Sequence, residues 1–186
     1  MPLACFSLRD YDVVHPPSLL IPTSLLFAQS EHIVFKTGDV NSPIKIIDFG
    51  VATIHRPGDA PLTTFAGSVR SVAPEIIKGK YGRECDLWSI GVIVYFLLTQ
   101  EMPFDGQSND QIFSKIVSGK FYYPQWTVNG LTEGVKHFID HLLLVDPRRR
   151  MTAKEAMSHS WIRGSSTQSR QLVVRPQHTT RRQGYY

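Results

Sequence analysis

The chain of 186 residues is 42% hydrophobic and 19% charged, a composition typical of one globular domain with a sizeable core. Its formal net charge of +4 would suit an acidic partner, but the tail from Arg163 holds five arginines and no acidic residue, which leaves 15 basic and 16 acidic residues elsewhere. The body is therefore nearly neutral, and we expect no nucleic-acid partner.

The N-terminal half is predicted to contain little regular structure. Residues 1–30 include four prolines and show neither a helical nor a strand period, so we expect an irregular segment there. Two short β-branched runs follow, over 32–36 and 44–48, and they flank a loop rich in turn-forming residues, which predicts a β-hairpin. Residues 51–72 have mixed composition and predict a long loop, a feature that is usually functional or mobile.

Helical signals dominate from Pro74 onward. Pro74 suits the first turn of a short helix over 74–78, which Gly79 would end. The run 87–98 is apolar on every side, so we expect a helix buried at the centre of the domain. Its 12 residues are too few to cross a bilayer, and no membrane partner is expected.

The remaining predicted helices carry an apolar stripe or a capping signal, and they cover 109–118, 132–145 and 152–158. Thr132 is the expected N-cap of the second, and Thr152 with Glu155 has capping-box spacing at the third. His137 and His141 have the spacing of a metal-binding pair, but we prefer the edge of an amphipathic helix. The tail 163–186 lacks a period and is expected to be disordered.

Several short motifs follow one another along the chain. Asp48-Phe49-Gly50 lies after a predicted strand, and Ala73-Pro74-Glu75 ends the long loop. The later motifs are the stretch 85–91 (CDLWSIG), the stretch 146–152 (DPRRRMT) and His159-Ser160-Trp161-Ile162. In this order they resemble the protein kinase family. The residues of the last motif are most similar to those of the calcium/calmodulin-dependent branch of the Ser/Thr kinases.

The resemblance implies a fold and a division of the chain. The expected fold is mainly α, a kinase-like C-terminal lobe with a small β-hairpin at its N-terminal side. The expected units are an irregular segment over 1–30, a partial kinase domain over 31–162 and a basic tail over 163–186. Because Cys5 and Cys85 make no disulfide framework, a reducing compartment is favoured, the cytoplasm first and the nucleus as the alternative.

The resemblance also implies ligands and structural roles. Asp48 would bind the Mg²⁺ that bridges the phosphates of ATP, and Val34 would form the floor of the adenine pocket. Glu75 would pair with Arg150 and fix the substrate loop. Within the stretch 85–91, Asp86 would hold the catalytic loop by hydrogen bonds, and Trp88 would pack below the substrate loop.

Three hydroxyl residues, Thr63, Thr64 and Ser68, stand where kinases of this family are phosphorylated. The arginine that would receive the phosphate is replaced by Leu26. A phosphate would add about two negative charges without that partner, so the sequence gives little support to a regulatory role.

The catalytic loop departs from the family pattern. Its window is 25–32, LLFAQSEH, in which only Glu31 matches. Phe27 stands at the position of the catalytic Asp, Gln29 at that of the Lys, and His32 at that of the metal-binding Asn. Phe27 cannot accept a proton or orient a hydroxyl group. The Gly-rich loop and the strand Lys of the family are not found upstream.

We therefore interpret the chain as a Ser/Thr kinase family member, truncated and inactive alone, for which ATP-dependent phosphorylation of protein substrates is implied only by resemblance. The alternative is a pseudokinase-type module that docks a substrate or a partner kinase, through the surface of residues 104–123 and the long loop. A third interpretation, an active kinase completed by another chain, is disfavoured by Phe27.

Overall fold

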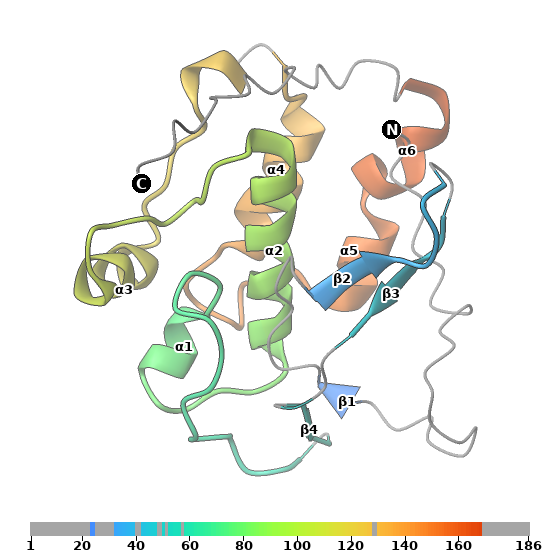
Figure 1. The fold of residues 1–186 in the computed structure, drawn as a ribbon. Coiled ribbons are helices and arrows are strands. Elements are labelled where there is room, and N and C mark those ends of the chain that lie inside the picture. The colour runs from blue at the N-terminus through green and yellow to red at the C-terminus, as the bar shows by residue number, and fades with distance from the viewer. Residues whose placement is uncertain are drawn as a thin grey trace, which may run out of the picture.

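The computed structural model describes residues 23–24, 32–39, 42–47, 50, 52–56, 58–127 and 130–168. Figure 1 shows these residues as a mostly helical body with small pieces of sheet at one side. The long helix α2 (Glu84–Thr99) runs through the centre, and α4 (Glu133–Leu142) packs against it. This architecture agrees with the mainly helical fold predicted from the sequence.

The predicted hairpin is present. Strands β2 (Ile33–Phe35) and β3 (Ile44–Ile46) pair antiparallel, with Ile33 opposite Ile46. Hydrogen bonds from Ile47 N to the carbonyl of His32 at 2.9 Å and from Lys36 N to that of Pro43 at 2.8 Å extend the pairing at both ends.

A second pair of strands was not predicted. β1 (Thr23–Ser24) and β4 (Thr53–Ile54) pair antiparallel, although the first thirty residues were expected to be irregular and residues 51–72 to form a loop. Thr and Ile are β-branched and suit an extended backbone. A two-residue strand, however, is too short to show a period of two, so the sequence pattern could not reveal it.

Helix α2 begins three residues before the apolar run, because Glu84 and Asp86 are favoured at the positive end of a helix. Gly91 allows close approach to α4, since a Cβ there would lie 2.9 Å from the Cβ of Leu142. The expectation that α2 is buried on every side was wrong: Leu97 is 52% exposed. α4 lies against the side that carries Gly91, so one side of α2 is covered there.

The remaining helices follow their capping signals. α1 (Pro74–Ile77) starts at a proline, and α3 (Asn109–Ser118) has the predicted bounds. Thr132 caps α4, which ends at Leu142 and not at the predicted 145, and Thr152 and Glu155 form the capping box of α5 (Ala153–Ser158). A short 3-10 helix, η2, covers Gln125–Thr127.

Helix α6 (Ser160–Gln168) continues past Arg163, so residues 163–168 are helical where disorder was expected. The rest of the predicted tail lies outside the described residues. Among the helices of 74–127 and 130–168, none combines the length and the hydropathy of a transmembrane span.

Candidate functional site

A buried ion pair joins the end of the long loop to the C-terminal half of the domain. Pro74 opens α1 and so places Glu75 in its first turn, facing inward. The Arg150 guanidinium binds both carboxylate oxygens of Glu75, with Nη1–Oε1 at 2.6 Å and Nη2–Oε2 at 2.9 Å. The side chains are 1% exposed for Arg150 and 7% for Glu75. A bidentate pair of this kind is geometrically strict.

Arg150 also satisfies two backbone carbonyls. Its Nη1 donates to the carbonyl of Glu84 at 2.7 Å, at the start of α2, and its Nε donates to that of Leu144 at 3.1 Å. The guanidinium lies 5.3 Å from the ring centroid of Trp88, which stacks on Phe104 with the two planes 11° apart. One side chain thus connects α1, α2, the loop after α4 and the aromatic core.

The segment ahead of α1 is attached at three points. Leu62 and Tyr81 form an antiparallel bridge, and the Tyr81 hydroxyl donates to the carbonyl of Thr64 at 2.6 Å. Burial raises the pKa of this hydroxyl, which therefore stays protonated and able to donate. Closer to α1, the Ser89 hydroxyl on α2 donates to the carbonyl of Ser71 at 3.0 Å. These contacts hold residues 62–73, here called the anchored loop, against α2 and the segment that leads into it.

The hydroxyl groups singled out in the sequence lie on this anchored loop. Thr63 and Thr64 are exposed, and Ser68 is half-buried. The carbonyl of Ser68 accepts hydrogen bonds from the backbone of the following turn. Beside them, Arg70 forms an ion pair with Asp105 at 2.7 Å, both side chains being about half exposed. Phosphorylation of Thr63, Thr64 and Ser68 stays a prediction.

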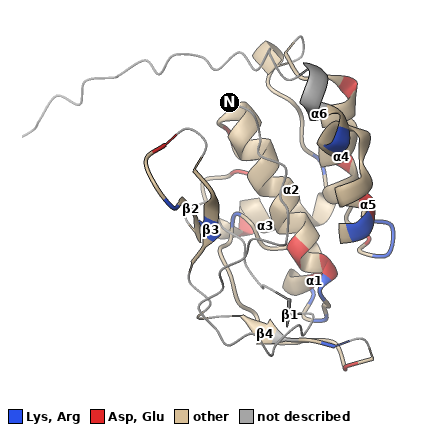
Figure 2. Cartoon of the chain, turned by 90° about the vertical axis from the view of Figure 1, so that its right-hand side faces the viewer, with Lys and Arg blue, Asp and Glu red and all other residues tan. Residues whose placement is uncertain are grey.

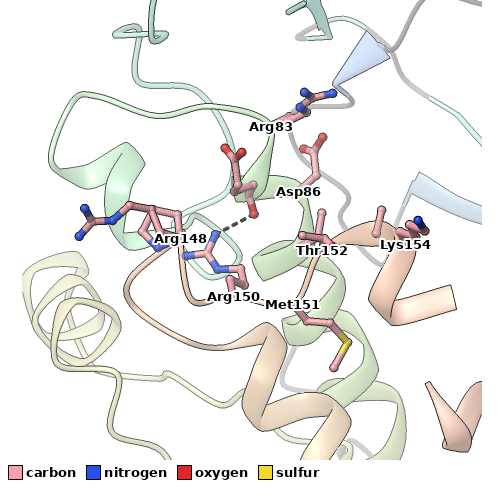
Figure 3. A pocket seen from close by; sticks show the side chains of 11 residues that line it. Arg83, Asp86, Arg148, Arg150, Met151, Thr152 and Lys154 are labelled. Atoms are coloured by element: carbon pink, nitrogen blue, oxygen red, sulfur yellow. Dashed lines mark hydrogen bonds between the residues drawn. The ribbon is translucent and has the colours of Figure 1, made fainter. Parts of the chain in front are cut away.

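A cavity of about 700 Å³ opens next to the ion pair, at the N-terminal end of α2 (Figure 3). Asp86 belongs to the α2 wall, whereas Arg148 and Lys154 come from the wall formed by the loop before α5 and by α5 itself. Figure 2 shows that residues of both charges lie here, with basic residues in α5 and the adjoining loop and acidic residues in the first turn of α2. The lining comprises Arg83, Glu84, Asp86, Leu87, Pro147, Arg148, Arg150, Met151, Thr152, Ala153 and Lys154.

The structure brings some of the predicted site residues together. Glu75 bonds Arg150, whose guanidinium lies over the Trp88 ring, and Asp86 lies on the cavity wall beside them. The roles that the family resemblance implies for these residues stay predictions. Val34 is half-buried on β2, remote in sequence from this cluster.

Two of the predicted positions cannot be placed. Asp48 and Phe27 lie outside the described residues. Within the described ranges, no group of three or more His, Cys, Asp or Glu side chains is arranged to hold a metal ion. The metal-site expectation for Asp48 therefore stays a prediction, and so does the replacement of the metal-binding Asn by His32.

Sequence reasoning missed the residues that fasten the anchored loop. Tyr81 and Ser89 belong to no motif that assigns them this task, and each acts through a single hydroxyl donated to a backbone carbonyl. A tyrosine next to a glycine and a serine inside an apolar helix were the available signals. A serine in a helix can instead bond its own preceding turn, as Ser89 also does to the carbonyl of Cys85 at 3.4 Å.

Comparison with known proteins identifies the fold's family. The model of the family described as "Protein kinase domain" matches residues 25–162. The chain belongs to the Ser/Thr protein kinase family. The match starts ahead of residue 31, so it includes the window 25–32. That Phe27 stands at the position of the catalytic Asp stays a prediction.

Curated relatives of this kinase chain are calcium-regulated by name. This chain is 37% identical over 162 residues to a calcium and calcium/calmodulin-dependent serine/threonine-protein kinase of Lotus japonicus, and the match covers 87% of this chain and 29% of that protein. It is 40% identical over 135 residues to calcium/calmodulin-dependent serine/threonine-protein kinase 1 of Oryza sativa subsp. japonica, covering 73% and 22%. The chain thus spans less than a third of the length of these relatives.

Proposed function

We propose that this kinase-family chain forms a C-terminal lobe that does not transfer phosphate by itself and instead docks proteins. One observation carries the proposal: Phe27 occupies the position at which the family places its catalytic Asp. Phosphoryl transfer in kinases depends on that carboxylate to orient the substrate hydroxyl and accept its proton. A phenyl ring can do neither.

The contacts that hold the anchored loop support the part of the proposal that concerns docking. The buried Glu75–Arg150 pair and the bond from Ser89 to Ser71 keep the end of the anchored loop in one conformation. This machinery serves the placement of a bound polypeptide and takes no part in the chemistry. A chain that retains it while carrying Phe27 is suited to hold a protein rather than to modify it.

ATP and Mg²⁺ are the ligands that the family uses, and we propose that this chain alone binds them weakly. Asp48 would supply one carboxylate for the metal. His32 stands where an amide oxygen is expected, and neutral imidazole is a poor ligand for Mg²⁺. Val34, half-buried on β2, would touch the adenine ring from one side only.

A specific surface favours docking. Phe65 of the anchored loop is 50% exposed and touches Phe113 of α3 edge-on, with ring centroids 6.1 Å apart. Val117, one helical turn beyond Phe113, is 39% exposed. The expected docking surface over 104–123 needs one correction: Phe104 is fully buried under Trp88 and cannot contact a partner. The exposed Phe65 and Val117 and the half-buried Phe113 would receive an apolar side chain of a protein substrate or partner kinase.

The first test is transfer of radioactive phosphate from ATP to a generic Ser/Thr peptide, with Mg²⁺ and the purified full chain. We expect no more label than with Asp48→Ala. Transfer that the wild-type chain performs and Asp48→Ala abolishes would overturn the inactive interpretation.

The second test is binding of that peptide, followed by fluorescence anisotropy. Val117→Asp places a charge among the docking residues and should weaken binding at least tenfold. Met157→Asp is the matched control, because Met157 is an equally apolar residue on α5 with 52% exposure, outside the docking surface. Equal affinity of the two variants would exclude this surface.

A further inference from the structure

Three histidines gather where α4 meets the start of α6. The Nδ1 of His137 lies 2.9 Å from the Nε2 of His159, and their rings are stacked with centroids 5.1 Å apart. The ring of His141, one turn further along α4, stacks on that of His137 at 3.9 Å. Phe138 and Trp161 complete the contact, since Phe138 touches both the His159 ring and the indole ring.

Backbone partners fix which nitrogens carry protons. Trp161 N–H can only donate, and it points at Nδ1 of His159 at 3.2 Å. His159 must therefore keep Nδ1 unprotonated and carry its proton on Nε2, from which it donates to Nδ1 of His137. By the same reasoning, Nδ1 of His141 donates to the carbonyl of His137 at 2.8 Å. His159, the residue just before α6, thus acts as its N-cap while it holds α4.

No added proton fits this arrangement. A proton on Nδ1 of His159 removes the acceptor that caps α6. A proton on Nδ1 of His137 sets two N–H groups against each other, unless His159 moves its own proton to Nδ1 and gives up the cap. Either event breaks one of the two hydrogen bonds that His159 makes, the cap on α6 or the bond to His137 on α4.

We propose that His137 and His159 form a proton-sensitive latch that holds α6 against α4 while both rings are neutral and releases α6 when His159 is protonated. This latch does not depend on the docking or catalytic properties of the chain. The described residues offer no metal site, and the two facing nitrogens are already bonded to each other, so the cluster is assigned to proton binding and not to metal binding.

The charged side chains on the elements around the latch have partners of their own or face solvent. On α4, Lys136 is paired with Glu133 and Asp140 accepts the Tyr123 hydroxyl. On α5, Glu155 is occupied in the capping box, and on α6 the side chain of Arg163 is exposed.

Burial, and secondarily the charges of His137 and His141, lower the pKa of His159 below its ordinary 6.5. The unfolded or released segment therefore takes up a proton more readily than the latched one. The stability of the latched state is fully present above pH 6.5 and decreases as the pH falls through that value.

The test is amide hydrogen exchange of the full 186-residue chain at pH 7.4 and pH 5.5, with rates divided by the intrinsic chemical rates at each pH. At the lower pH, we expect protection of Ser160–Gln168 to fall about fivefold, the effect of losing one N-cap, while protection of α2 is unchanged. In His159→Asn the side-chain oxygen can still cap α6 but does not titrate, so protection of α6 should be independent of pH. His55→Asn is the control for a histidine elsewhere and should behave like the wild type.

Constant protection of α6 in the wild type would overturn the latch. So would a pH-dependent loss of the same size in His159→Asn, because it would place the sensitivity in another group. Loss of protection in α2 and α6 together would indicate global unfolding and would equally refute a local release.

Discussion

Replacing Glu75 with Gln is the sharpest test of the ion pair at the centre of the fold. Gln has nearly the same shape as Glu, so the change removes a charge without opening a cavity. Arg150, only 1% exposed, would keep its positive charge with just the carbonyls of Glu84 and Leu144 and one amide oxygen as acceptors. Removing one partner of a buried pair costs about 3–5 kcal/mol, and because Gln still accepts one bond we expect about 3 kcal/mol.

Equilibrium urea unfolding, followed by tryptophan fluorescence and circular dichroism, measures this loss. With a slope of about 1–3 kcal/mol/M, 3 kcal/mol moves the midpoint by about 1–3 M. Arg148→Gln is the matched control, because Arg148 pairs with Asp146 at 3.2 Å on an open surface, and we expect its midpoint to equal that of the wild type. If Glu75→Gln and Arg148→Gln unfolded at the same urea concentration, the assignment of the buried pair as a principal stabilising contact would be refuted.

A double replacement separates charge from packing. In Glu75→Met with Arg150→Met no buried charge is left unpaired, and apolar side chains of similar length fill the site. We expect this double variant to be more stable than Glu75→Gln. A double variant that is less stable would show that the guanidinium contributes mainly through the carbonyls of Glu84 and Leu144.

Three further predictions rest on other contacts. Gly91→Ala should destabilise the chain by about 1–3 kcal/mol in urea unfolding, because the new methyl group would press on Leu142 across the α2–α4 contact. Cys85 is 1% exposed and burial raises the pKa of its thiol strongly, so in a Cys5→Ser background a thiol reagent at pH 8 should label it only at the rate of unfolding. Burial raises the pKa of Tyr95 to about 12 from its usual 10.0, so the folded state holds this proton more tightly than the unfolded state. The stability of the fold should therefore decrease as the pH rises above about 10. An unchanged melting temperature between pH 9 and pH 11 would contradict this.

Local chemistry made much of the fold predictable. α3 has the bounds read from its apolar stripe, and Thr132 and Thr152 cap α4 and α5 as their side chains suggest. These signals depend only on residues within one turn of each other. The contact between Glu75 and Arg150 is long-range, and it followed from family resemblance rather than from any local rule.

Features that depend on where two elements meet were not predictable. The pairing of β1 with β4 needs two residues from each, fewer than any periodic pattern requires. The exposure of Leu97 depends on which neighbours cover α2 and not on its own composition. His137 and His141 stood out by their spacing, but His159, the partner of His137, comes from a separate segment.

The separation of Glu75 and Arg150 along the chain bears on how the protein is made. The two residues are 75 positions apart. At a synthesis rate of about 5–20 residues per second, Glu75 exists for about 4–15 s before its partner is added. During that time α1 and α2 can form as local helices, but Glu75, which follows the anchored loop, has no arginine to pair with. A chain whose synthesis ends before residue 150 would therefore contain these helices with a carboxylate that lacks its partner. Such a chain is a natural substrate for chaperones and proteases.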